Sequence, residues 1–198
     1  MRVDGRINPG YYYYVAVNAT GNRDYGPVPT ADASGNGWGT SDAPGADKIQ
    51  GLTHYIEYGP NVPGPGYGVY RFQDSALQQG EYLGRPADYT VPSSSSGTLW
   101  FAIDLSQLGE TSDNRILEIC VNLIATNRIL PDGGKLRDGL GPDGTTYLAR
   151  LPTGVNTTYQ NAWQVEERDG DVLDSLGRQV GDPDLDIIDW KIEVRGNK

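Results

Sequence analysis

The sequence has very few of the residues that form disulfides, bind transition metals or build nucleophile–base pairs. Its 198 residues include one cysteine, one histidine and one methionine. A single cysteine excludes an intramolecular disulfide, and zinc sites normally use several Cys or His ligands. Cys120 lies in an apolar run and His54 in a strand-like segment. We therefore interpret both as structural residues, with no Ser-His-Asp or Cys-His centre.

Positive charge is also scarce, and long apolar runs are absent. The chain has 16 Lys and Arg against 26 Asp and Glu, for a net charge of −10. This charge disfavours nucleic acid and anionic membranes as partners. No run approaches the roughly 18 apolar residues of a transmembrane segment, and residues 1–20 lack a basic-then-apolar signal pattern. We expect an exported, extracellular or cell-surface domain whose signal or lipid anchor is absent from this chain; a cytoplasmic product is the alternative.

Strand-forming and turn-forming residues are plentiful. The chain has 13 Tyr and 27 Gly, and it is poor in the residues that fill helices. No amphipathic helical segment lies between the strand candidates, which argues against a parallel α/β fold. The sequence predicts one all-β domain over residues 1–198. We expect an antiparallel β-sandwich of jelly-roll type, with long Gly/Pro-rich loops and little helix.

The segment Tyr11–Asn18, Tyr-Tyr-Tyr-Tyr-Val-Ala-Val-Asn, is the clearest strand. Side chains alternate between the faces of a strand, so this segment has two rows. One row belongs to a core, and the other is a phenolic face that is either covered or offered to a partner. The first row is Tyr11, Tyr13, Val15 and Val17, and the second is Tyr12, Tyr14, Ala16 and Asn18.

Other segments complete the expected sheets. Arg2–Ile7 is a short strand before Asn8-Pro9-Gly10, which makes either a hairpin or a corner between sheets. The remaining predicted strands are Leu52–Tyr58 and Tyr67–Phe72, which form a hairpin, Thr98–Leu105, Arg115–Thr126 at the centre of a sheet, and Leu185–Val194 with Ile188, Trp190, Ile192 and Val194 facing the core. Short candidates are Thr146–Leu151 and Ala162–Val165. We expect loops over residues 19–50, 73–97 and most of 127–184, and one helical turn at Ser106–Gly109.

Aromatic residues outside the expected core are the best functional signal. Sugar rings stack on Trp and Tyr while neighbouring polar groups bind their hydroxyls. The strand alternation assigns Trp100 and Trp190 to cores. A carbohydrate or surface polymer is therefore predicted to contact Trp38, Trp163, Tyr12 and Tyr14. Alternatively, Trp38 folds back over the sandwich edge, or the aromatic residues pack copies of the chain in a filament or adhesive surface subunit.

Acidic residues near the C-terminus raise two further hypotheses. Asp182, Asp184 and Asp186 are candidate Ca²⁺ ligands, and the alternative is a solvated acidic rim. Asp-Gly-Asp-Val-Leu-Asp is not an EF-hand loop, because Leu is fifth and no Gly is sixth. A pair of carboxylates would also serve a glycoside-active enzyme. The sequence singles out no such pair, so we expect a non-catalytic protein without another cofactor.

Three segments together resemble a known family. They are Val3–Asn18, Leu99–Leu108 and Leu185–Val194, which contain Tyr-Tyr-Tyr-Tyr-Val-Ala-Val-Asn, Leu-Trp-Phe-Ala-Ile-Asp-Leu and Asp-Trp-Lys-Ile-Glu-Val. Their order is similar to DOMON-like and family 9 carbohydrate-binding-module-like sandwiches, and to bacterial exported or lipoprotein domains. The resemblance implies a jelly-roll-type sandwich that binds sugars or haem. Cytochrome members use Met and His as haem ligands, and here only Met1 and His54 are present.

Overall fold

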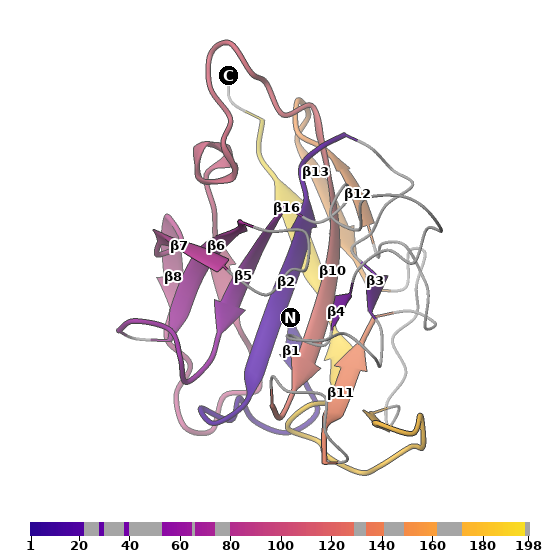
Figure 1. Ribbon diagram of the computed structural model, residues 1–198. Helices are drawn as coiled ribbons and strands as arrows, with labels where there is room; N and C mark the ends of the chain where they lie inside the picture. Colours follow the sequence, from indigo (N-terminus) through magenta and orange to yellow (C-terminus); the bar gives the residue numbers. More distant parts are fainter. Residues whose placement is uncertain are drawn as a thin grey trace.

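The computed structural model describes residues 1–21, 28–29, 38–39, 53–64, 66–73, 80–128, 134–140, 149–161 and 172–196. The described residues form an all-β, sandwich-like fold with antiparallel pairing, as the sequence predicted (Figure 1). Their single 3-10 turn is Leu105–Leu108 (η1). It is capped by Asp104 and by Gly109, whose φ of 87° favours glycine. The helical turn expected here is therefore confirmed.

The larger layer is an eight-stranded sheet. Its strand order is β14-β11-β10-β2-β5-β6-β7, and β12 also pairs with β10. The long strand β10 lies at the centre, because it pairs with β2 along one edge and with β11 and β12 along the other. The strands are β2 (Tyr12–Asn18), β5 (His54–Tyr58), β6 (Tyr67–Phe72), β7 (Gly80–Gly84), β10 (Glu118–Thr126), β11 (Leu136–Gly139), β12 (Ala149–Pro152) and β14 (Leu173–Asp174).

The second layer consists of shorter pairs. β1 pairs with β15, β13 with β16, and β8 with β9. A bridge between Arg2 and Thr98 joins β1 to the segment that enters β9. The strands are β1 (Arg2–Val3), β8 (Asp88–Thr90), β9 (Trp100–Ala102), β13 (Thr157–Gln160), β15 (Ile187–Asp189) and β16 (Lys191–Val194). A further pair, β3 (Val28–Pro29) with β4 (Trp38–Gly39), lies beside β10.

The main core lies between the two layers. Alternation along β2 and β10 places one apolar row of each strand there, as predicted. Tyr13 and Val17 on β2 face the same core as Val121 and Leu123 on β10. In Figure 1, β1 and β16 of the second layer lie behind β2 and β10. The opposite row of β2 contributes Tyr14 and Ala16 to a separate, smaller cluster.

The N-terminal turn is a corner between layers, so the hairpin alternative is wrong. β1 pairs with β15 in the second layer, whereas β2 pairs with β5 and β10 in the eight-stranded sheet. Asp184 holds this crossing. Its carboxylate accepts hydrogen bonds from the Arg6 backbone at 3.0 Å and the Asn8 side chain at 3.3 Å. Its backbone carbonyl accepts the hydroxyl of Tyr13 at 2.8 Å.

Several predicted strands differ from those observed. The predicted hairpin is present as β5 and β6. Residues 73–97 are not a continuous loop, because they include β7 and β8. Likewise, β11, β13 and β14 lie in the region expected to be mostly loop. These strands have five residues or fewer and contain glycine or polar residues, so they show little alternation. The candidate Ala162–Val165 lies outside the described residues, and of residues 19–50 only 19–21, β3 and β4 are described.

For three apolar residues the strand alternation predicts burial in the core, and the structure places them elsewhere. Trp100 was expected in a core, but 50% of it is exposed, because Leu99 and Phe101 on either side of it turn inward. The predicted strand Arg115–Thr126 places Leu117 in one apolar row with Ile119 and Val121, but Leu117 precedes β10 and is 76% exposed. Near the C-terminus, Ile187 rather than Ile188 enters the core, because the strand is interrupted before Trp190. Trp190 itself is buried as predicted.

Candidate binding groove and tyrosine face

The predicted stacking residues do not form one site among the described residues. The backbone of Trp38 belongs to β4 and pairs with Pro29. Its side chain, and all of Trp163, lie outside the described part of the chain. Tyr12 is half-buried, and Tyr14 is only 1% exposed. Tyr14 therefore offers no ring face to a ligand in this structure.

Tyr12 and Tyr14 belong to an aromatic cluster on the outer side of the eight-stranded sheet. We call it the tyrosine face; it comprises Tyr12, Tyr14, Tyr55, Tyr70 and Phe72. The rings of Tyr55 and Tyr70 stack with centroids 4.7 Å apart, and Tyr14 meets Tyr55 edge-on at 6.0 Å. Such pairs stabilise a sheet beyond their buried area. The phenolic row of β2 is thus largely covered.

A buried carboxylic acid lies within the tyrosine face. Glu57 stands opposite Tyr14 across the β2–β5 pair and is 6% exposed. Among the described residues no donor lies within hydrogen-bonding distance of its Oε1 atom. Burial raises the pKa of Glu57 to about 7, because the charged form loses its hydration. No sequence signal pointed to Glu57, because the residues that bury it lie on neighbouring strands and are brought to it by the strand register.

The candidate calcium ligands serve as hydrogen-bond acceptors. Asp182 accepts the hydroxyl of Tyr11 at 3.0 Å and the backbone N–H of Asp184 at 3.2 Å. Asp184 holds the N-terminal corner described above, and Asp186 is buried. Among the described residues, no three His, Cys, Asp or Glu side chains gather into a metal-binding group. Calcium binding by Asp182, Asp184 and Asp186 therefore stays a prediction without geometric support.

The single histidine and the single cysteine are packed into the sheet. His54 is buried, and its Nδ1 lies 2.8 Å from the Thr53 hydroxyl. Burial, together with the nearby Arg71 guanidinium, lowers the pKa of His54 to about 4. Cys120 is buried and forms no disulfide. Both residues have the structural placement that the sequence indicated.

A large groove lies between the two layers. Its volume is about 770 Å³, and its floor is the inner side of the eight-stranded sheet. Val15 lies at the centre of that floor, between Leu123 of β10 and Ile56 of β5. Although Val15 belongs to an inner strand of the sheet, it is only half-buried. We call this feature the open groove.

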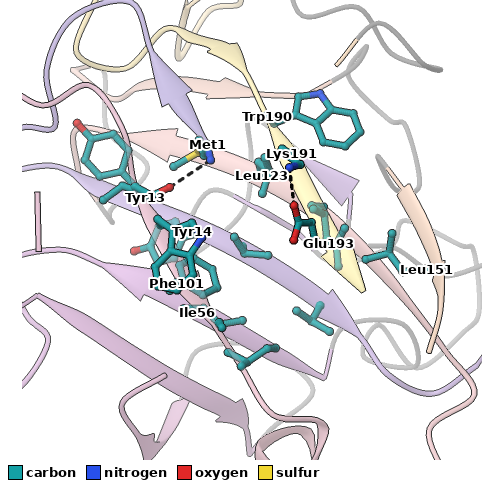
Figure 2. A pocket seen from close by; sticks show the side chains of 18 of the residues that line it. Met1, Tyr13, Tyr14, Ile56, Phe101, Leu123, Leu151, Trp190, Lys191 and Glu193 are labelled. Atoms are coloured by element: carbon teal, nitrogen blue, oxygen red, sulfur yellow. Dashed lines mark hydrogen bonds and ion pairs between the residues drawn. The ribbon is translucent and has the colours of Figure 1, made fainter. Parts of the chain in front are cut away.

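Two strands of the second layer form the walls of the open groove. One wall comprises the segment from Thr98 to Ile103, including β9, and the other comprises Trp190 and β16. Phe101 and Ile103 on the first wall, and Ile192 and Val194 on the second, are half-buried and pack against the core. Figure 2 shows Ile56 and Leu123 beneath the groove, with Lys191 and Glu193 on β16 beside it.

The upper rim of the open groove carries balanced charge. Lys191 forms an ion pair with Glu193, which also pairs with Arg195 at 3.1 Å. Across the second layer, Arg2 lies 3.7 Å from Asp189. These exposed pairs contribute little to stability. The groove therefore combines an apolar floor with a rim that favours neither an anionic nor a cationic ligand.

The buried indole of Trp190 lies at the end of this groove. Trp190 is 4% exposed, and among the described residues its Nε1–H has no hydrogen-bond acceptor. A buried donor without an acceptor costs ~1–3 kcal/mol. The sequence predicted that Trp190, Ile192 and Val194 face the core, but it did not indicate that they would border an open space.

Comparisons with known proteins add no relative. No family model matches the chain, and neither a curated protein nor a solved structure matches it. No helix within the described ranges is long and apolar enough to cross a membrane. The fold and the groove thus define the class: an all-β, sandwich-like protein with antiparallel sheets and an apolar groove between its layers.

Proposed function

We propose that this protein is a non-catalytic binding subunit of an extracellular or cell-surface assembly, and that the open groove is its binding site. The observation that carries the proposal is the half-buried Val15 on an inner strand of the eight-stranded sheet. A sandwich normally covers the inner side of its sheets completely. An apolar groove of this size between two layers is typical of a ligand or partner site.

The burial of the aromatic residues favours binding in the open groove over binding through the tyrosine face. Tyr14 and Tyr55 are both buried, and Tyr12 is half-buried. The open groove, in contrast, exposes apolar side chains from both layers. A ligand that filled the groove would remove those side chains from water. Burial of apolar surface contributes a favourable free energy of ~25 cal/mol per Å².

A fluorescent dye that binds apolar sites tests the proposed site directly. We expect 1-anilinonaphthalene-8-sulfonate to bind the folded protein saturably, with fluorescence enhancement. Val15→Trp and Ile192→Trp, which fill the groove from the floor and from one wall, should each weaken binding at least tenfold. Leu117→Ser, which changes an exposed apolar residue elsewhere, should leave binding unchanged. Equal dye binding by Val15→Trp, Ile192→Trp and the unchanged protein would contradict the proposal.

Carbohydrate binding is a second candidate function. It is favoured by Trp100, whose exposed ring lies on the outer side of β9 opposite Thr90. An indole beside a hydroxyl group suits the apolar face of a sugar. Glycan-array binding that is lost in Trp100→Ala, Trp38→Ala or Trp163→Ala would support this function. Absence of binding at millimolar oligosaccharide would remove it.

A further inference from the structure

The open groove lies in line with β1, on the N-terminal side of Met1. β1 lies between two neighbours and is antiparallel to both: Arg2 pairs with Asp189 on one side and with Thr98 on the other. Beyond Met1, the neighbouring segments continue as β16 and β9. Since both are antiparallel to β1, they run in the same direction. A single strand between two neighbours separates them by ~10 Å, which is twice the usual strand spacing.

Both walls present a strand edge that is unpaired within the described residues. β9 pairs only with β8, and β16 only with β13. Leu99 exchanges two backbone hydrogen bonds with Met1, at 3.0 and 3.3 Å. Alternation along the strand therefore directs the backbone groups of Phe101 and Ile103 toward the groove.

The backbone of β16 is oriented in the same way. The carbonyl of Trp190 accepts a hydrogen bond from Asn161, on the side of β13. Alternation then directs the backbone groups of Lys191 and Glu193 toward the groove. The groove thus has strand edges on both sides and an apolar floor below. A compact apolar molecule would use only the floor, because it cannot form hydrogen bonds with both strand edges. The groove is the environment of a β-strand.

The side-chain rows of the two walls are in register. Met1 and Val3 point inward on β1, and Arg2 points outward. Consider a strand that continues β1 on the N-terminal side of Met1. Its second residue before Met1 would lie between Phe101 and Ile192. The fourth falls between Ile103 and Val194. Apolar side chains at these alternate positions would therefore continue the inward rows of both neighbours.

We infer that the open groove binds an extended polypeptide segment as an added β-strand, antiparallel to both β9 and β16. This inference rests on the proposed function of the groove and names its ligand class. The segment carries apolar residues at alternate positions and lies with its C-terminal end toward Met1. We assign it to a partner protein rather than to a second copy of this one, because two copies, each with a net charge of −10, repel one another.

A strand supplied within the chain tests whether the groove accepts this geometry. The extension Thr-Val-Thr-Val-Thr, placed directly before Met1, puts its two valines at the inward positions. We expect a rise in Tm of about 5 °C or more, because the added strand pairs with both walls and buries its valines. The matched control adds one threonine between the extension and Met1, which turns the valines outward and should abolish the rise. Equal Tm values for the two extended proteins would overturn the inference.

A free peptide tests binding between chains. The probe is Lys-Thr-Val-Thr-Val-Thr-Lys, and the readout is hydrogen–deuterium exchange of the unmodified protein. We expect at least tenfold slower exchange at the amides of Phe101, Ile103, Lys191 and Glu193, and no such protection with the Val→Ser peptide. Exchange unchanged at all four amides would overturn strand addition. Dye binding sensitive to Val15→Trp would then still support an apolar groove, whereas loss of both results would remove the groove as a site.

The source of the strand is tested by sedimentation. We expect the protein alone to remain monomeric at high concentration. Self-association that disappears in Val15→Trp would show that a second copy supplies the strand, and it would overturn the assignment to a different chain.

Discussion

At the scale of single residues, position on a strand decides the role of an aromatic ring. Trp100 and Trp190 lie on adjoining parts of the second layer, yet one is exposed and the other fully packed. The difference follows from alternation: Leu99 and Phe101 take the inward positions around Trp100. Trp190 shares its inward row with Ile192 and Val194.

These two tryptophans predict opposite costs of truncation. Trp190→Ala should reduce the free energy of unfolding by ~3–5 kcal/mol, because it leaves a cavity in the core. Trp100→Ala should change it by less than ~0.5 kcal/mol, as is usual for exposed positions. Urea unfolding followed by circular dichroism measures both. Similar losses for the two variants would contradict the placement of Trp100.

Glu57 predicts a pH dependence of stability. In the unfolded chain its pKa is near 4.5, and in the folded protein it is about 7. Below pH 4.5 both states are protonated, so Glu57 imposes no penalty. As the pH rises from 4.5 to 7, the unfolded chain loses this proton while the folded protein retains it, so stability falls by about 3 kcal/mol in total.

The matched variant is Glu57→Gln. It should raise the free energy of unfolding at pH 8.5 and leave it nearly unchanged at pH 4.5, because glutamine stays neutral at both values. Denaturant unfolding at the two pH values measures the difference. A stabilisation of equal size at both pH values would show that shape, rather than ionisation, accounts for the effect.

At the scale of elements, hydrogen bonds at the N-terminal corner fix which layer each strand joins. Asp184 binds the segment between β1 and β2 through Arg6 and Asn8. This contact directs β1 into the second layer, beside β15, and β2 into the eight-stranded sheet. The position of β1 in turn defines the line of the open groove.

Asp184→Ala should therefore destabilise the crossing. It removes the acceptor of the Arg6 N–H and the Asn8 side chain, at a cost of ~1–3 kcal/mol. Asp184→Asn keeps one side-chain acceptor oxygen and should cost less. Hydrogen exchange should become faster at Arg6 and at Val3, which donates to Gly97. Unchanged exchange at both amides would show that the corner does not depend on Asp184.

At the scale of the whole molecule, the sequence predicts the fold class better than the site. Period-two alternation identifies β2, β5, β6 and β10, because these strands are rich in aromatic and aliphatic residues. It misses β7, which has glycine at both ends, and β11 and β13, where polar residues are frequent. Trp38 and Trp163 drew attention as isolated aromatics, but no local pattern shows what surrounds them. The open groove depends on which strand edges remain unpaired, and that is a property of the assembled layers rather than of any segment.

The central claim is that the inner side of the eight-stranded sheet is accessible at Val15. The most direct measurement is maleimide labelling of Val15→Cys in the folded protein, compared with Val17→Cys, which lies on the same row of β2 but is 1% exposed. The buried Cys120 is present in both proteins and reports any unfolding. We predict labelling at least a hundredfold faster at residue 15 than at residue 17, with Cys120 unmodified. Equally slow labelling at both positions would show a closed sandwich and contradict the account.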